Sequence, residues 1–214
     1  MDGSLLTAVD LAEQIRAHSL ALELDGRHTD ARDLARQADR LPGEGDAATD
    51  ATTAQVRILT ASASCLASQG RLAEADSTIR EALRLAEASF GRSDPETAEV
   101  HRALGRVLRQ RGRYAEAATN LWRALSIVEN ERGPDHPDTA GLHRELAELG
   151  LARGWLIEAE SHARQGVEIR AAGGGTDPEA ATDAMVLAAI LVAAGRHDEA
   201  EPLLRQAKGT LSGI

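Results

Sequence analysis

The 214-residue sequence has few aromatic residues and a single cysteine. Aromatic side chains make up 2% of the chain and hydrophobic residues 43%, so the core must be built mainly from Leu, Ile, Val and Ala. That composition favours helices packed on helices over β-sheets, which are enriched in aromatic and β-branched residues. Because Cys65 stands alone, an internal disulfide and the usual zinc clusters are excluded.

Basic residues are also scarce relative to acidic ones, which gives a net charge of −10. A general nucleic-acid-binding protein is expected to carry the opposite balance. No apolar run reaches the roughly 20 residues of a membrane helix, and the opening MDGSLLTAVD lacks the basic start and cleavage site of a signal peptide. We therefore expect a soluble, cytoplasmic protein without nucleic-acid or membrane partners. Its heavy use of Ala, Arg and Gly is typical of GC-rich bacterial genomes.

Three common enzyme motifs are missing from the sequence: G-x-x-x-x-G-K-[ST], H-E-x-x-H and G-x-S-x-G. The glycine-rich stretch GGGT at 173–176 precedes a predicted helix, but it lacks the preceding strand and the lysine of a phosphate-binding loop. We interpret it as a linker. The sequence thus predicts no catalytic residues, no cofactor and no metal site.

A pattern of about 42 residues recurs along the chain. Turn glycines, each separated by four residues from a following alanine, lie 42, 42 and 41 residues apart at Gly70, Gly112, Gly154 and Gly195, and Gly26 extends the series backwards. Prolines that are well suited to a first helical position recur in phase with them at Pro95, Pro137 and Pro178. The pattern predicts five helix–turn–helix hairpins, at about 4–41, 50–90, 94–132, 136–172 and 177–208, and a tail at 209–214.

Three positions of every repeat hold only Ala, Gly or Ser. With the turn glycine counted as position 15, these are positions 8 (Ser19, Ala63, Gly105, Ala147, Ala188), 20 (Ala31, Ala75, Ala117, Ala159, Ala200) and 27 (Ala38, Ala82, Ala124, Gly166, Ala207). Helices approach each other closely only where side chains are small. We expect these positions in tight helix contacts, where a larger residue costs about 1–3 kcal/mol.

This pattern resembles the tetratricopeptide repeat, and its length resembles the kinesin-light-chain-like variant of that repeat, which is also common in bacterial signalling proteins. The resemblance is strong over 91–207, good over 52–90 and weak in the first repeat. The usual Trp at position 4 is absent, since His101 and His143 stand there. The resemblance implies an all-α, right-handed α-solenoid over residues 1–208, in which the first helix of each hairpin lines a concave groove. The small residues disfavour another solenoid class, such as HEAT.

The resemblance also implies which residues contact a ligand, because positions 2, 5, 9, 12 and 13 of the family bind peptides. The expected contact residues are Arg57, Thr60, Ser64, Arg102, Arg106, Arg109, Gln110, Arg144, Glu148, Met185 and Val192. Arg102, Arg106 and Arg109 share one helix face, and arginine suits bidentate contact with carboxylate or phosphate. Alternatively, this strip is a solvated face balanced by acidic neighbours such as Glu99.

The sequence thus predicts a non-catalytic adaptor or regulatory module that binds a protein or peptide with acidic or C-terminal carboxylate groups. In this prediction Arg144 joins the arginine strip, Thr60, Ser64 and Gln110 form hydrogen bonds with the ligand backbone, and Met185 and Val192 form an apolar pocket. Two alternatives stay open. One is self-assembly into a homo-dimer through the terminal hairpins, and the other is a sensor of a small anionic ligand.

Several single residues receive simpler interpretations. His101 and His143 lie one repeat apart and can share a metal or respond to pH, but no third ligand is in phase, so packed positions are favoured. Cys65 is expected to fill space at a buried helix position. The repeat motif implies that His136, just before Pro137, is a cap or linker residue.

Overall fold

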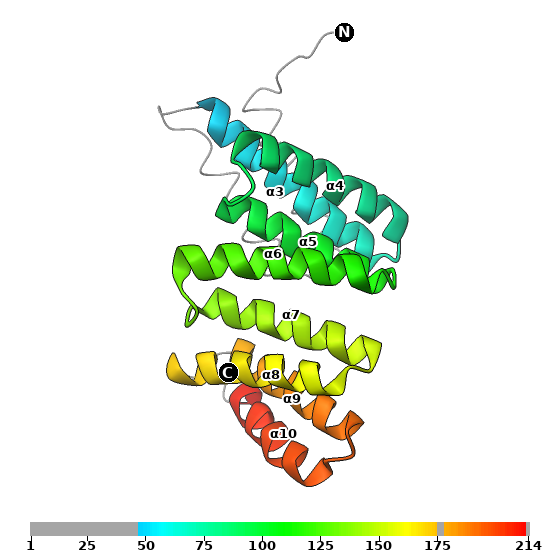
Figure 1. Ribbon diagram of the computed structural model, residues 1–214, viewed down its shortest axis with the longest axis vertical. Helices are drawn as coiled ribbons and strands as arrows, with labels where there is room; N and C mark the ends of the chain where they lie inside the picture. The colour runs from blue at the N-terminus through cyan, green and yellow to red at the C-terminus, as the bar shows by residue number, and fades with distance from the viewer. Residues whose placement is uncertain (1–46, 175–177, 213–214) are drawn as a thin grey trace. The chain divides into compact units, whose positions relative to one another are not determined.

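The computed structural model describes residues 47–174 and 178–212 and shows only helices among them. The helices are α3 (Ala47–Ser68), α4 (Leu72–Ser89), α5 (Pro95–Gln110), α6 (Tyr114–Arg132), α7 (Pro137–Arg153), α8 (Leu156–Ala172), α9 (Pro178–Ala193) and α10 (His197–Ser212) (Figure 1). The predicted all-α fold is confirmed. The predicted hairpin at 4–41 lies outside the described residues, while α3 to α10 match the two helices expected in each of the other four repeats.

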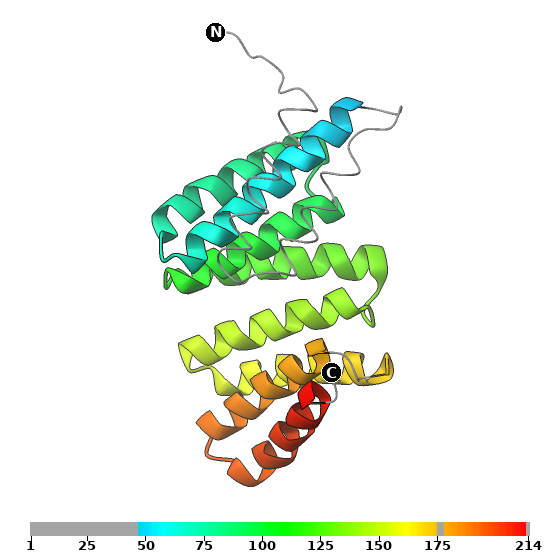
Figure 2. The same cartoon turned by 180° about the vertical axis from the view of Figure 1, so that it is seen from behind.

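The chain divides into two compact units, Met1–Arg111 and Gly112–Ile214, called here the N-terminal and C-terminal units. In the N-terminal unit, α3 and α4 form a hairpin and α5 packs against both of them (Figures 1 and 2). In the C-terminal unit, α7 pairs with α8 and α9 with α10, and α9 packs against both helices of the preceding hairpin. This arrangement, in which a new first helix rests on the previous pair, is how helical hairpins stack in repeat proteins.

The prolines begin helices as the sequence predicts, and Pro95 and Pro137 are each preceded by a capping residue. Asp94 accepts a hydrogen bond from the backbone N–H of Glu96 at 2.8 Å, at the start of α5. At the start of α7, Nδ1 of His136 accepts the N–H of Asp138 at 3.1 Å, so the capping role of His136 is confirmed. Such side chains satisfy N–H groups that have no partner within the helix.

The turn glycines end the first helices in the left-handed conformation. Gly70, Gly112, Gly154 and Gly195 have φ values of 77°, 73°, 77° and 77°. A residue with a side chain is strained at such values, so glycine is the residue that closes the turn at lowest cost. The sequence-based assignment of these turns is therefore correct.

The small residues at positions 8, 20 and 27 are buried in every repeat that the structure describes. Their ten alanines are at most 2% exposed, and Gly105 and Gly166 are buried as well. The expected burial of Cys65 is also confirmed. Among the described residues, no helix combines the length and the apolar character needed to cross a membrane.

A buried carboxylate ties α4 to the end of α5 in the N-terminal unit. Asp76 on α4 accepts a hydrogen bond from Nε of Arg80 at 2.8 Å and pairs with the guanidinium group of Arg111. Because Asp76 is only 7% exposed, these two arginines compensate a charge that is expensive to bury alone.

The contact between α7 and α8 leads to a prediction of opposite effects at two glycines. A Cβ atom on Gly150 would lie 2.9 Å from Cβ of Ala159, whereas one on Gly209 of α10 would meet nothing within 4 Å. We expect Gly150→Ala to lower the free energy of unfolding by about 1–3 kcal/mol through overpacking. Gly209→Ala should raise it by about 0.5–1 kcal/mol, because glycine is the poorer helix former.

Urea unfolding followed by circular dichroism measures both substitutions in the same background. Equal or same-signed effects would contradict the tight α7–α8 contact.

Candidate functional site

The residues expected to contact a ligand on α3 are partly engaged within the protein. Nε of Arg57 donates to Glu96 of α5 at 3.0 Å. The hydroxyl of Thr60 donates to the carbonyl of Val56 at 2.8 Å, and that of Ser64 to the carbonyl of Thr60 at 3.1 Å. The hydroxyl protons are therefore used by the helix itself, while the oxygen lone pairs can still accept a hydrogen bond from a ligand.

Two arginines of α5 lie near the same carboxylate. The guanidinium nitrogens of Arg102 and Arg106 lie 3.8 and 3.9 Å from the carboxylate oxygens of Glu99. These separations are ion pairs too long for hydrogen bonds, and the side chain of Arg102 is 19% exposed while that of Arg106 is 40% exposed. Arg109 lies one turn further along the same helix, and Gln110 is exposed at its end.

Arg144 has a different environment in the C-terminal unit. Its Nη1 donates to Glu179 at 2.6 Å and to Asp183 at 2.9 Å, both on α9. Arg170 on α8 donates to the second carboxylate oxygen of Asp183 at 3.0 Å. The side chains of Arg144 and Asp183 are 13% and 1% exposed, so the network is largely buried. It connects α7, α8 and α9.

The surroundings of Asp183 have opposing effects on the pKa of its carboxyl group. Burial raises the pKa of the Asp183 carboxyl, and the guanidinium groups of Arg144 and Arg170 oppose that shift. The guanidinium of Arg144 is thus bound to carboxylates of its own chain. Its role as a ligand anchor stays a prediction.

The remaining expected contact residues lie on α7 and α9. Glu148 is partly buried on α7. On α9, Met185 and Val192 are 46% and 44% exposed. Their spacing of seven residues, with exposed Ala189 between them, puts all three on one helix face. They form an exposed apolar stripe, called here the α9 stripe.

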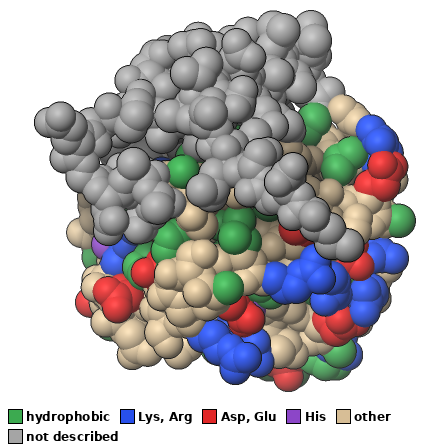
Figure 3. Space-filling view, turned by 90° about the horizontal axis from the view of Figure 1, so that it is seen from above, with side chains coloured by type: hydrophobic (Ala, Val, Ile, Leu, Met, Phe, Trp, Pro, Cys, Tyr) green, Lys and Arg blue, Asp and Glu red, His purple; other side chains and the backbone are tan. Residues whose placement is uncertain are grey.

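One face of the molecule, seen from above, carries charges of both signs. Lys and Arg side chains visible there lie beside Asp and Glu side chains (Figure 3).

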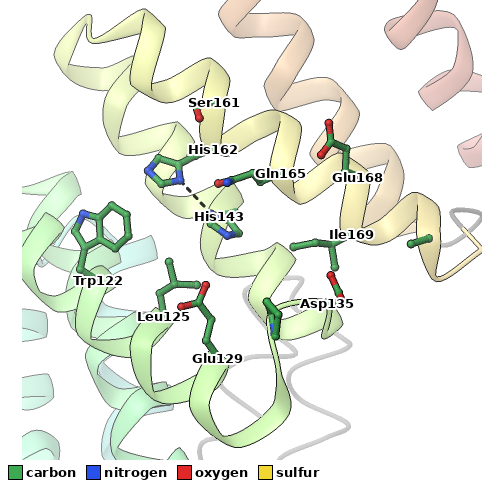
Figure 4. Close-up of a pocket in the computed structure, with 12 residues that line it drawn as sticks. Trp122, Leu125, Glu129, Asp135, His143, Ser161, His162, Gln165, Glu168 and Ile169 are labelled. Atoms are coloured by element: carbon green, nitrogen blue, oxygen red, sulfur yellow. Dashed lines mark hydrogen bonds between the residues drawn. The ribbon is translucent and has the colours of Figure 1, made fainter.

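A pair of histidines forms a contact that the sequence did not predict. His143 on α7 and His162 on α8 bring their Nδ1 atoms within 3.0 Å of each other, with stacked rings (Figure 4). Burial, and then the neighbouring His162, lowers the pKa of His143 to about 4. Burial also lowers the pKa of His162, while a hydrogen bond with Gln165 opposes that shift.

His162 occupies a position whose residue type is not kept from repeat to repeat. Its equivalents in the other described repeats are Thr78, Asn120 and Leu203, so the repeat pattern gives no reason to select it. Within residues 47–174 and 178–212, no group of three His, Cys, Asp or Glu side chains is arranged to hold a metal ion.

Comparison with known families identifies the repeat. The profile described as tetratricopeptide repeat matches residues 55–130 and 107–172, which together make up more than half of the chain. The chain belongs to the tetratricopeptide repeat family. Repeats of this family generally mediate protein–protein interactions or scaffolding, and the family consists in general of non-catalytic binding modules.

Solved tetratricopeptide repeat structures share the fold. BtubC (BKLC) from P. vanneervenii has a TM-score of 0.72 and 19% identity, over 96% of this chain and 82% of that one. A putative kinesin light chain with nearly identical TPR-like repeats from Podosopora anserina has a TM-score of 0.65 and 23% identity, over 97% of each chain. The resemblance to the kinesin-light-chain-like variant is confirmed at the level of fold. A comparison with curated protein sequences finds no match.

Proposed function

We propose that this tetratricopeptide repeat chain is a non-catalytic, cytoplasmic adaptor or regulatory module of a bacterium. Its ligand is a protein or peptide that presents acidic side chains or a C-terminal carboxylate. The observation that carries the proposal is the placement of Arg102 and Arg106 one turn apart on the same face of α5, with Arg109 one turn further along. A ligand carboxylate can form a bidentate hydrogen bond with either guanidinium group.

The proposal assigns further groups in each compact unit, and each unit is considered by itself. In the N-terminal unit, Thr60 and Ser64 offer hydroxyl lone pairs to ligand N–H groups, and Gln110 offers its amide. In the C-terminal unit, the α9 stripe offers Met185 and Val192 to an apolar side chain, since methionine adapts to varied shapes. Arg57, Arg109 and Glu148 supply further polar contacts at the positions used by the family.

The test is a pull-down from lysate with identification of captured proteins by mass spectrometry. The baits are the wild type and an Arg102→Glu, Arg106→Glu double variant. Arg144 is left unchanged because its replacement would disturb the buried network around Asp183. The matched control is Arg84→Glu, Arg123→Glu, which reverses two exposed arginines on α4 and α6 and gives the same net charge.

We expect a partner that binds the wild type and the control but is lost by the double variant. In a titration with the partner's own acidic segment, the double variant should bind at least about tenfold more weakly, because charge-assisted hydrogen bonds are lost. Equal binding by all three baits would contradict the arginine site. Self-association of the wild type without any partner would favour the scaffold alternative.

A further inference from the structure

A cavity of about 560 Å³ lies in the C-terminal unit, and α6, α7 and α8 surround it. Trp122 and Glu129 of α6 line one side, His162 and Gln165 of α8 line the other, and His143 of α7 lies between them (Figure 4). Its volume falls within the range of sites that hold small molecules or single large side chains. None of the residues of the surface proposed above lines it.

The walls of the cavity combine an aromatic ring with aliphatic groups. The ring of Trp122 is half exposed and meets the ring of His162 edge-to-face, with centroids 5.2 Å apart. Leu125 and Ile169 add apolar surface. A half-exposed indole beside aliphatic groups is well suited to a flat ligand group, and above all to a cation that is attracted to the face of the ring.

The histidine pair makes the floor of the cavity uncharged and polar. Because the two Nδ1 atoms share one hydrogen bond, one of them carries a proton and the other accepts it. In uncharged rings the remaining nitrogens are then one acceptor and one donor. His143 is only 7% exposed, and its lowered pKa keeps it neutral at pH 7. A cation in the cavity therefore meets no positive charge from these rings.

The charged groups of the lining are all acidic. Glu129, Asp135 and Glu168 line the cavity, and none of the twelve lining residues is Lys or Arg. Within the described part of the chain, none of these three carboxylates forms an ion pair, whereas Glu160 on the same α8 helix is bound by Arg164 and Arg196. Carboxylates without a cation, placed beside an aromatic ring, repel phosphate and attract positive charge.

We infer that this cavity binds an organic cation with a planar guanidinium head, which lies against Trp122 and donates hydrogen bonds to Glu129 or Asp135. A guanidinium group fits better than an ammonium ion because it is flat, stacks on aromatic rings and forms bidentate bonds with carboxylates. The cation is either a free small molecule or an arginine side chain presented by a partner protein. This binding site goes beyond the proposed peptide-binding surface and does not depend on it.

The test uses three probes with the full-length chain. Agmatine represents a free small molecule, Nα-acetyl-arginine amide represents an arginine within a polypeptide, and the matching citrulline amide has nearly the same shape without the charge. Binding is measured by calorimetry and by the fluorescence of Trp122 in a Trp155→Phe background. Trp155 lies outside the cavity, under the guanidinium group of Arg153, so its replacement leaves the site unchanged.

We expect saturable binding of one or both arginine-like probes and at least about tenfold weaker binding of the citrulline amide. Glu129→Gln should weaken binding of the cations about tenfold. Glu131→Gln, on the exposed side of the same helix and outside the cavity, should leave it unchanged. Tighter binding of agmatine would identify a free small molecule as the ligand. Tighter binding of Nα-acetyl-arginine amide would identify an arginine side chain of a partner protein.

Three results would overturn the inference. They are the absence of a Trp122 response to either cation, equal binding of the citrulline amide, and equal weakening by Glu129→Gln and Glu131→Gln. Circular dichroism of each variant confirms that the helices are intact before binding is compared.

Discussion

Replacing Asp183 with alanine is expected to lower the free energy of unfolding by about 3–5 kcal/mol. The carboxylate of Asp183 is the shared acceptor of Arg144 and Arg170, and the three side chains are 1%, 13% and 11% exposed. Without the carboxylate, two poorly hydrated guanidinium groups lose the acceptor that they share, while Glu179 stays beside them. Removal of one partner of a buried ion pair is costly because the remaining charge stays buried without compensation.

This cost does not mean that the network adds the same amount of stability. Burial raises the pKa of Asp183 despite the two arginines, so part of their attraction is offset by the loss of water around the carboxylate. We therefore expect the network to fix how α7, α8 and α9 pack more than to supply a large net free energy.

Urea unfolding measures the effect, with Glu201→Ala as the control. Glu201 pairs with Arg205 on the surface of α10, where both side chains are more than two-thirds exposed. Its loss should cost less than about 1 kcal/mol. Equal losses in the free energy of unfolding for Asp183→Ala and Glu201→Ala would show that Asp183 does not compensate the buried charges of Arg144 and Arg170.

Acidification from pH 7 to pH 4 is expected to remove about 3 kcal/mol of stability through His143 alone. Burial lowers the pKa of His143 from 6.5 to about 4 in the folded protein. The unfolded chain therefore takes up a proton first as the pH falls. The contribution of the neutral His143 to the free energy of unfolding is complete above pH 6.5 and is lost progressively as the pH falls towards 4.

The measurement compares the pH dependence of urea unfolding in the wild type and in His143→Gln. Carboxylates such as Glu160, whose pKa the neighbouring Arg164 and Arg196 lower, also lose stabilisation at low pH. They are common to both proteins and cancel in the difference. His197→Gln, at an exposed position on α10, serves as the control and should follow the wild-type curve. A His143→Gln curve that is as steep as the wild-type curve would contradict the prediction.

The hairpin pattern was predictable from sequence because it depends on local and repeated requirements. Glycine at Gly154 is needed for a left-handed turn, proline at Pro137 suits a first helical turn, and Ala159 must be small where two helices meet. Each requirement applies at a fixed position of every repeat, so the same type of residue recurs at that position along the sequence.

The partners of individual side chains were not predictable in the same way. Arg144 occupies a position that contacts ligands in the family, yet here Asp183 and Glu179 hold it, and both of these belong to another helix. The sequence placed His143 correctly on the first helix but gave no sign of His162. Long side chains reach across helices, so their contacts depend on packing that a repeat pattern does not encode.

The hairpin turns also bear on how such a chain evolves. Gly70, Gly154 and Gly195 share one backbone conformation, and a Cβ atom on any of them would meet nothing within 4 Å, so the turns have the same local geometry in different repeats. A hairpin is therefore a segment that recombination can copy, delete or exchange whole. The contact residues of its first helix travel with it, and ligand preference can diverge one repeat at a time while the neighbouring repeats keep their fold.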